Sequence, residues 1–461
     1  MLFTSATFLQ YFLPAFLALY YVTPKGARSF TIAIASYLFY GWWRPDFLAL
    51  MFVSTIVDFT AGARIARAGP RTREARRWVW VSLTVNLGLL AYFKYANFGV
   101  ETLNALLGSD SITWTKVVLP VGISFYTFQT LSYTIDVYRG TSQPVARFRD
   151  FMCYVAMFPQ LVAGPIVRYN TIADQLADRT HTPSKFYQGV LAFQAGLIKK
   201  VLVADVLSGV ADAAFAAEGL GVGAAWIGAI AYTFQIYFDF SGYSDMAIGL
   251  GLMIGFRLPI NFDQPYRSRS ITEFWRRWHI SLSTFLRDYL YVPLGGNRLG
   301  PGRTYFNLSL TMLLGGLWHG AAWTFIAWGA YQGFWLVVER LNSRRPLYAR
   351  LPASLSMACT FVLVILGWVL FRAASLPDAV DYLASLFGMA GGGGISPESI
   401  VRPIHLIAFA FAALIVWRAP TTQALISRGD GRWALLLQPL FVIALLHLHF
   451  VDHVPFLYFQ F

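Results

Sequence analysis

Residues 361–370 read Phe-Val-Leu-Val-Ile-Leu-Gly-Trp-Val-Leu, at the centre of an apolar stretch that covers 354–373. A helix that crosses the hydrocarbon core of a bilayer needs about 20 apolar residues, and this stretch supplies them. It lacks the alternation of apolar and polar residues that marks a strand of a membrane β-barrel. The whole chain has 461 residues, 57% of them hydrophobic and 13% charged, whereas soluble domains average about 25% charged residues. The sequence therefore predicts an all-α, polytopic integral membrane protein.

Further apolar segments predict roughly ten to twelve membrane-associated helices. They occur near residues 5–22, 29–42, 47–62, 78–93, 116–137, 151–165, 186–217, 223–256, 304–338, 403–417 and 433–450. Proline and glycine interrupt residues 158–165, and non-helical backbone at membrane depth is tolerated only when it is buried in protein or lines a cavity. We expect that segment to be re-entrant or kinked. No shift of composition marks a second domain, so residues 1–461 are predicted to form a single membrane-embedded domain.

The arginines predict the orientation of the chain. The formal net charge is +13, and six arginines lie between residues 64 and 77 against one acid, Glu74. Loops rich in arginine and lysine stay on the cytoplasmic side of a membrane, so this loop is expected inside and the N-terminus outside. The first apolar segment lacks the features of a signal peptide and is expected to be retained. No nucleic-acid-binding module accompanies the basic residues, so topology explains them better than nucleic acid does.

The two cysteines, Cys153 and Cys359, lie in separate apolar regions. Neither a disulfide framework nor the ligand spacing of a zinc site can be built from them. Both are expected to be core thiols, and no metal site is predicted.

His319 lies within the apolar run Leu313-Leu-Gly-Gly-Leu-Trp-His-Gly320. An ionisable side chain at membrane depth is a candidate functional residue, because it must be hydrated or paired by the protein. On a helix, Gly315, Gly316 and Gly320 would lie near its face and leave a void for a substrate. A buried imidazole stays neutral and is able to act as a general base. The alternative is structural: Gly316 and Gly320 have the spacing of a helix-packing motif, and the histidine would then only bridge helices.

Residues 257–300 are polar enough to leave the membrane and are dense in aromatic residues. Ser270 and Glu273 have the form of a capping box, which predicts a helix from Ile271 to about Tyr289, supported by the pair Glu273–Arg277. The helix would have the aromatic face of an interfacial helix, formed by Trp275, Trp278, Phe285 and Tyr289.

His279 lies on this predicted helix, flanked by Arg276, Arg277 and Trp278. A cationic, aromatic surface that faces the cytoplasm suits a phosphate-rich carrier such as coenzyme A, because the guanidinium fork matches phosphate geometry. We therefore expect these three neighbours to bind the donor of a reaction. The alternative is a belt of tryptophan and arginine that only anchors the helix at the interface.

Asp239 and Asp245 lie in or beside an apolar span, where carboxylates need partners. Arginines are available at positions 257, 276 and 287, so structural ion pairing is the favoured interpretation. The alternative is a proton relay in a transporter, although the matched broken helices of secondary transporters are not visible. Four histidines near the C-terminal spans are expected to be interfacial rather than catalytic: His405, His447, His449 and His453.

Six motifs, in this order and spacing, resemble those of the membrane-bound O-acyltransferase family. They are Tyr237-Phe-Asp-Phe-Ser-Gly-Tyr-Ser-Asp245, Asn261-Phe-Asp-Gln-Pro-Tyr266, Phe274-Trp-Arg-Arg-Trp-His-Ile-Ser-Leu-Ser283, Leu286-Arg-Asp-Tyr289, Gly295-Gly-Asn-Arg298 and Leu317-Trp-His-Gly320. The resemblance covers nearly the whole chain. It is closest to the membrane subunit of bacterial alginate O-acetylation, with Phe at position 285 where relatives often carry Trp.

The resemblance implies particular site residues and a fold. His319 corresponds to the histidine regarded as catalytic in the family, and His279 to a second active-site candidate. From the same motifs, Trp318, Asp288 and Ser283 are expected to support the site. The family fold is a ring of helices around a funnel, with the counterpart of His319 at its constriction.

The resemblance also implies a reaction. Members of this branch move an acetyl group from cytoplasmic acetyl-CoA outward across the bacterial inner membrane. They pass it to periplasmic partners that resemble Ser-His-Asp hydrolases and acetylate an extracytoplasmic polysaccharide. Acetyl-CoA is thus expected as acyl donor, with no bound cofactor. Three alternatives stay open: acetylation of another glycan such as peptidoglycan or cellulose, membrane transport, and a scaffold for export without chemistry.

Overall fold

The computed structural model describes residues 1–108, 111–389, 394–427, 431–450 and 456–457. Regular structure in those ranges is helical, apart from one isolated parallel bridge between Leu220 and Ile395. The all-α prediction is therefore confirmed. The chain groups into two compact units, residues 1–193 with 246–259 and residues 194–245 with 260–461. Each unit is described by itself, and the single domain expected from the sequence stays a prediction.

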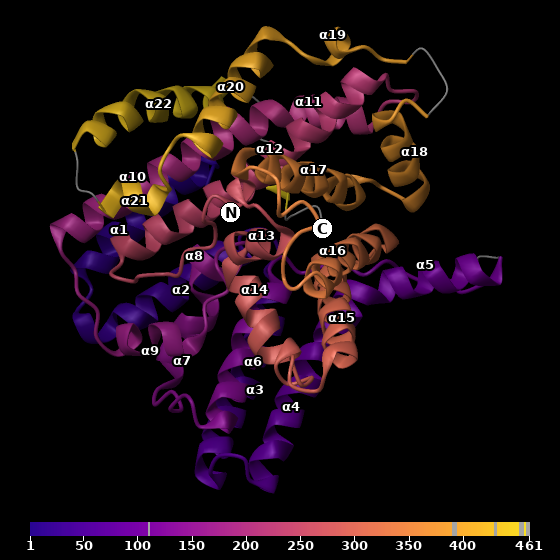
Figure 1. Cartoon of the computed structure of the whole chain (residues 1–461). Coiled ribbons are helices and arrows are strands. Elements are labelled where there is room, and N and C mark those ends of the chain that lie inside the picture. Colours follow the sequence, from indigo (N-terminus) through magenta and orange to yellow (C-terminus); the bar gives the residue numbers. More distant parts are fainter. Residues whose placement is uncertain (109–110, 390–393, 428–430, 451–455, 458–461) are drawn as a thin grey trace. The chain divides into compact units, whose positions relative to one another are not determined.

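The first unit is built from short and long helices of the N-terminal half. They are η1 (Thr7–Phe12), α1 (Leu13–Val22), η2 (Lys25–Ala27), α2 (Arg28–Gly41), α3 (Phe47–Ala68), α4 (Arg73–Leu90), η3 (Ala91–Tyr95), α5 (Ala96–Leu107), α6 (Ile123–Arg139), α7 (Phe148–Ala156), α8 (Phe158–Leu161), α9 (Tyr169–Ala177) and the first part of α10 (Pro183–Lys199). Helices α3, α4 and α6 pack side by side (Figure 1). Between them Asp58 is fully buried and accepts hydrogen bonds from Ser82 Oγ and, at 2.8 Å, from Asn86 Nδ2, as polar groups between apolar helices require.

The interrupted segment 158–165 is kinked, as predicted. Its only helical turn is the buried α8, and irregular backbone follows it. Gly122 approaches this segment so closely that a Cβ there would lie 2.7 Å from the carbonyl oxygen of Leu161. Gly122 also has a φ of 78°, a region that favours glycine. The depth of this segment in a membrane stays a prediction.

The second unit carries the residues singled out in the sequence. Its elements are the end of α10, η4 (Lys200–Ala204), α11 (Asp205–Phe215), most of α12 (Val222–Met253), η5 (Pro265–Arg267), α13 (Ile271–Arg277), α14 (Ile280–Leu286), η6 (Arg287–Tyr291), α15 (Pro301–His319), α16 (Trp323–Leu341), α17 (Ala353–Arg372), α18 (Leu376–Leu386), α19 (Pro397–Ile400), α20 (Pro403–Trp417), α21 (Thr422–Ser427) and α22 (Gly431–Phe450).

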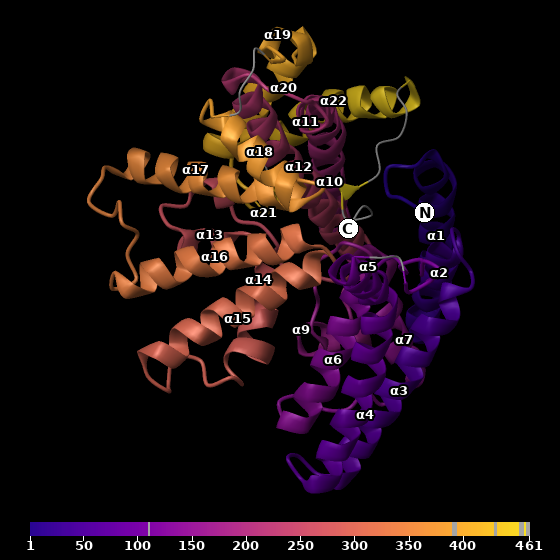
Figure 2. The same ribbon diagram turned by 90° about the vertical axis from the view of Figure 1, so that its right-hand side faces the viewer.

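Helices α15 and α16 form an antiparallel hairpin, so the apolar segment 304–338 is two helices and not one. Glycines allow the two backbones to touch: a Cβ on Gly316 would lie 2.3 Å from the carbonyl oxygen of Phe325, and one on Gly329 would lie 2.5 Å from that of Met312. Small residues permit this kind of close helix approach. Figure 2 shows α17, α16 and α15 stacked in that order. The hairpin places His319 at the very end of α15.

Helix α16 also fixes α13. The carboxylate of Glu339 on α16 accepts the backbone N–H groups of Ile271 at 2.6 Å and Thr272 at 2.9 Å. A carboxylate at a helix N-terminus satisfies open N–H groups and interacts favourably with the helix dipole. Further along, Trp275 Nε1 donates to Gln332 Oε1 at 3.1 Å. The two helices are therefore joined at the start of α13 and again at Trp275.

Candidate membrane spans are fewer than the sequence predicts. Within the described residues, α3, α17 and residues 432–450 of α22 are long and apolar enough to cross a membrane. Shorter apolar helices cover Thr7–Val22 and Pro403–Trp417. The number of ten to twelve membrane-associated helices, and their arrangement around a funnel, stay predictions.

The glycine contact between α15 and α16 predicts how substitutions there change the free energy of unfolding. Gly316→Ala should lower the free energy of unfolding by about 1–3 kcal/mol, because the added methyl group forces the helices apart. The matched control is Gly302→Ala on the same helix, where a Cβ would meet nothing within 4 Å. Thermal unfolding in detergent compares the two, and equal midpoints would refute the close contact.

Candidate active site

Two histidines from different elements meet in the second unit. His319 ends α15, and His279 lies between α13 and α14. Their ring centroids are 6.1 Å apart. His279 is fully buried, and His319 keeps 6% of its surface exposed. The structure thus brings together the two residues that the sequence singled out for chemistry.

Aromatic rings surround the histidine pair. The Trp318 ring lies 5.0 Å from His319 and 6.0 Å from His279, and the Trp328 ring meets His319 edge-on at 5.2 Å. Phe240 approaches His279 to 4.6 Å. His279 belongs to none of the helices long enough to span a membrane. Burial lowers its pKa well below the ordinary value, and the neighbouring His319 acts in the same direction. The site is therefore suited to a neutral imidazole.

The predicted continuous helix from Ile271 to Tyr289 is wrong. Its start is confirmed, because Ser270 Oγ accepts the N–H of Glu273 at 3.0 Å, and Arg277 pairs with Glu273 at 2.9 Å. The helix stops at Arg277, however, and His279 adopts a left-handed conformation with φ 43° and ψ 55° before α14 begins. The expected interfacial face is also wrong for Trp275, Trp278 and Phe285, whose side chains are buried in the core, whereas Tyr289 is partly exposed.

The expected void beside His319 is filled by protein. Gly320 lies beyond the helix in an extended conformation, and a Cβ there would lie 2.0 Å from the Phe325 ring. Gly316 contacts α16, and a Cβ on Gly315 would lie 3.1 Å from Leu286. The helix-packing alternative is therefore the right interpretation of these glycines.

A basic cleft of about 440 Å³ lies beside α13, α15 and the C-terminal half of α16. It is lined by Ser270, Thr272, Glu273, Arg276, Leu308, Leu336, Arg340 and Arg344. Of the predicted donor-binding residues, Arg276 lies in this cleft. Arg277 is held by Glu273 and, through Nη1, by the carbonyl oxygen of Asp263 at 3.2 Å. Trp278 is buried. The donor-binding roles stay predictions.

The sequence patterns did not predict that Arg340 and Arg344 belong to the site. The available signal was the cluster of arginines at positions 340, 344, 345 and 350. Along α16, Arg340 follows Trp328 by twelve residues, which is about 18 Å of helix. Trp328 contacts His319, so Arg340, in the last turn of α16, and Arg344, just beyond its end, lie far along this helix from the histidine pair. Arg276, in contrast, lies three residues before His279.

The three predicted supporting residues lie in different surroundings. Trp318 contacts both histidines, as described above. Ser283 Oγ donates to the carbonyl oxygen of Trp278 at 3.2 Å and so braces the turn that carries His279. Asp288 lies on η6 and binds Arg287 at 2.6 Å. Of the three, Trp318 is the residue whose ring contacts the imidazoles, and the supporting roles stay predictions.

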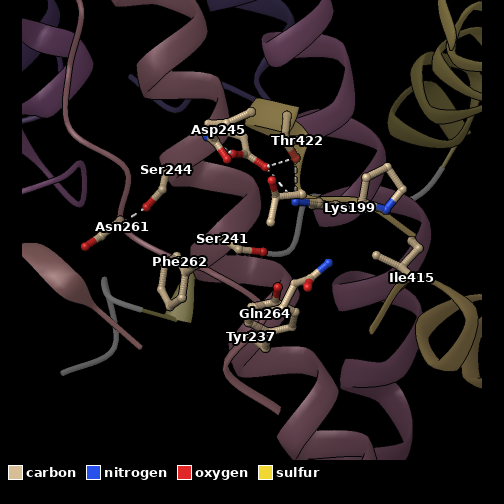
Figure 3. A pocket seen from close by; sticks show the side chains of 13 residues that line it. Lys199, Tyr237, Ser241, Ser244, Asp245, Asn261, Phe262, Gln264, Ile415 and Thr422 are labelled. Carbon is tan, nitrogen blue, oxygen red and sulfur yellow. Dashed lines mark hydrogen bonds and ion pairs between the residues drawn. The ribbon is translucent and has the colours of Figure 1, made fainter. Parts of the chain in front are cut away.

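Asp239 and Asp245 form ion pairs, as predicted from the sequence. Their partners are lysines, however, and not the arginines that were expected. Lys200 binds Asp239 at 2.8 Å, and Lys199 binds Asp245 at 2.6 Å. Thr422 Oγ1 also donates to Asp245 at 2.6 Å (Figure 3). The pocket drawn there offers about 20 Å³, which is room for a water molecule and not for a substrate. The carboxylates are structural.

The remaining candidates lie outside the site. His405 accepts the N–H of Arg402 at 3.0 Å, and His447 and His449 lie in the last turns of α22. His453 lies outside the described residues. Both cysteines are free thiols. Cys153 is fully buried, as expected for a core thiol, whereas Cys359 is only partly buried, so that expectation is wrong for Cys359.

Comparison with known proteins agrees with this geometry. The profile described as the membrane-bound O-acyltransferase family matches residues 146–372, a range that contains both histidines and the basic cleft. The "Probable alginate O-acetylase AlgI" of Pseudomonas putida is 48% identical and aligns over 100% of both chains. The protein of the same name from Azotobacter vinelandii is 54% identical over 84% of this chain and 78% of its own.

A relative with another name is more distant. The "Peptidoglycan O-acetyltransferase" of Helicobacter pylori is 37% identical over 85% of this chain and 80% of its own. The resemblance stated from the motifs is therefore confirmed.

The buried ion pairs generate a stability prediction. Lys199→Met should lower the free energy of unfolding by about 3–5 kcal/mol, because it leaves the buried Asp245 carboxylate without its cation. The matched control is Lys116→Met, which breaks a lysine–carboxylate pair whose side chains are 78% and 60% exposed and should have little effect. Thermal unfolding in detergent compares the two variants. Equal losses would contradict a structural role for the Lys199–Asp245 pair.

Proposed function

Because the chain belongs to the membrane-bound O-acyltransferase family, we propose that it is the membrane O-acetyltransferase that moves acetyl groups toward alginate outside the cytoplasm. The observation that carries this proposal is the buried histidine pair within the matched region. Alginate is favoured over peptidoglycan because identity is 48% and 54% to the two alginate O-acetylases and 37% to the peptidoglycan enzyme.

His319 is the proposed general base. It takes the proton of the acceptor hydroxyl while the hydroxyl oxygen attacks the thioester carbonyl carbon. A C–O bond forms, the C–S bond breaks, and the proton passes to the leaving thiolate. A positioned base of this kind contributes about 10²–10⁴ in rate. His279 orients the donor carbonyl or shares the proton. The aromatic rings around the pair keep water out, which protects the thioester from hydrolysis.

Acetyl-CoA is the proposed donor, and the basic cleft is its proposed phosphate site. Arg276, Arg340 and Arg344 offer guanidinium groups to the nucleotide phosphates. Arg340 lies about 18 Å along α16 from Trp328, a distance that suits the long pantetheine arm between those phosphates and the sulfur. The arginines at 344, 345 and 350 favour a cytoplasmic location for this end of α16, which is where acetyl-CoA is made.

The proposal extends to the location and the partners. We place the chain in the bacterial inner membrane as a multi-pass protein with its N-terminus in the periplasm, supported by the arginines between residues 64 and 77. The acetyl group then passes to a periplasmic acetyltransferase-like partner, in keeping with the family resemblance. Whether the partner or the polymer is the immediate acceptor, the chemistry at His319 is the same.

No observation supports a transporter or an export scaffold. A proton-relay transporter needs an intramembrane carboxylate that changes its charge, whereas Asp239 and Asp245 are held by lysines. A scaffold that catalyses no reaction does not require a pair of histidines shielded from water. It would also tolerate substitution of His319, which the following experiment tests.

Replacing each histidine separates their roles. His319→Ala should lower acetyl transfer from labelled acetyl-CoA in proteoliposomes by at least about 10³-fold, and His279→Ala by about 10²-fold. His449→Ala, on the exposed end of α22, should transfer at the wild-type rate. The amount of inserted protein is measured in parallel. Full transfer by inserted His319→Ala protein would remove the base from the mechanism.

Substitutions in the cleft test the donor. Arg276→Ala and Arg340→Ala should each raise the KM for acetyl-CoA about tenfold or more, as expected for a lost charge-assisted hydrogen bond. The KM for acetyl-pantetheine, which has no nucleotide phosphates, should not change. Arg350→Ala, in the same basic loop but outside the cleft, controls for total charge. The phosphate site is wrong if Arg350→Ala behaves like the cleft variants, or if both donors are affected equally.

A further inference from the structure

His279 has a backbone conformation that non-glycine residues rarely adopt. Five described non-glycine residues have positive φ: Arg71, Gln264, His279, Ser343 and Arg344. Among these five, His279 is the buried one. Such strained residues persist when the surrounding structure over-determines them, and they occur often at functional sites. The contacts that hold His279 in this conformation therefore matter.

The local sequence does not account for the break between α13 and α14. Residues 278 and 279 are Trp and His, which differ little in helix propensity from most other residues, and neither proline nor glycine lies there. In an unbroken helix the N–H groups of Ile280 and Ser281 would donate to the carbonyl oxygens of Arg276 and Arg277. Something outside the helix must therefore replace those bonds.

Asn261 replaces them. Its carbonyl oxygen accepts the N–H of Ile280 at 2.9 Å, and its Oδ1 accepts the N–H of Ser281 at 3.2 Å and the Ser281 hydroxyl at 2.9 Å. The freed carbonyl oxygen of Arg277 accepts the N–H of Asp263 at 2.9 Å. Residues 261–263 thus satisfy the backbone on both sides of His279, as buried polar groups require.

The side chain of Asn261 is itself anchored. It is 1% exposed, and its Nδ2 donates to Ser244 Oγ on α12 at 3.2 Å (Figure 3). Phe240, one turn earlier on α12, contacts the His279 ring at 4.6 Å. The amide therefore ties the turn at His279 to the helix against which its imidazole packs.

We infer that Asn261 is a positioning residue, which holds the turn that aims His279 at His319. The inference rests on the proposed function of the histidine pair. Without the Asn261 amide, Ser281 loses both of its hydrogen bonds to Oδ1 while the two backbone bonds remain, so the turn loosens and the His279 ring shifts from its place beside Phe240 and His319. Misplacement of a reacting group by about 1 Å costs about 10²-fold in rate.

Kinetics of the Asn261→Ala variant test the inference. The turnover number should fall about 10–100-fold, while the KM for acetyl-CoA stays unchanged, because the basic cleft is intact. The double variant with His279→Ala should be no slower than His279→Ala alone, because a positioning residue acts through the group that it holds. Ser281→Ala removes one of the two donors to Oδ1 and should give a smaller, several-fold loss if Asn261→Ala fails to fold.

A second buried asparagine provides the matched control. Asn307 is fully buried on α15, and its Nδ2 donates to the carbonyl oxygens of Leu294 at 3.2 Å and Gly296 at 3.0 Å. Asn307→Ala should lower the unfolding midpoint about as much as Asn261→Ala and leave the turnover number unchanged.

The outcomes separate this inference from the proposed function. If His279→Ala is slow and Asn261→Ala has wild-type turnover, the positioning role is wrong while the function stands. The same holds if Asn261→Ala multiplies the loss of His279→Ala, since that indicates a general structural effect. Wild-type turnover in His279→Ala would overturn the role of His279 and this inference together.

Discussion

The backbone contact between α15 and α16 is the constraint on which the rest of the second unit depends. Gly316 and Gly329 let the helices meet without side chains between them, so their distance is fixed by backbone atoms and not by adaptable packing. Gly316 lies within one turn of the end of α15, and His319 is the last residue of that helix. The same α16 carries Trp328 against His319 and Glu339 against α13. One hairpin therefore positions the proposed base, part of its enclosure and the helix that leads to the second histidine.

The site combines two environments that one surface could not provide. At one end of the α13–α16 pair, aromatic rings enclose two imidazoles and exclude water. Three arginines line a neighbouring cleft: Arg276 lies three residues before His279, and Arg340 and Arg344 lie at and just beyond the far end of α16. The proposed thioester donor needs both environments, because its phosphates are strongly hydrated anions and its reactive carbonyl must be protected from water. The length of α16 keeps Arg340 about 18 Å from Trp328.

Local patterns in the sequence predicted the features that depend on composition and short-range spacing. These include the helical class, the start of α13 at Ser270, the pair Glu273–Arg277, and the two histidines. The features that were missed depend on contacts between distant segments. Lys199 pairs with Asp245, and Lys200 pairs with Asp239, from a different helical segment. The hydrophobic periodicity of the sequence does not indicate such pairs. The break at His279 is likewise imposed by Asn261. Glycine spacing around His319 indicated a close approach correctly, but a partner helix occupied the space that a substrate was expected to fill.

Glu339 acts on the site indirectly, by holding the start of α13. One carboxylate accepts two consecutive backbone N–H groups, a task for which a glutamine amide offers one acceptor and an aspartate falls a methylene short. The residue is buried, and the hydrogen bonds of its carboxylate go to the backbone of α13 and not to an imidazole. In a genetic screen, alleles at codon 339 would therefore be recovered with the loss-of-function class, although the side chain meets no reactant.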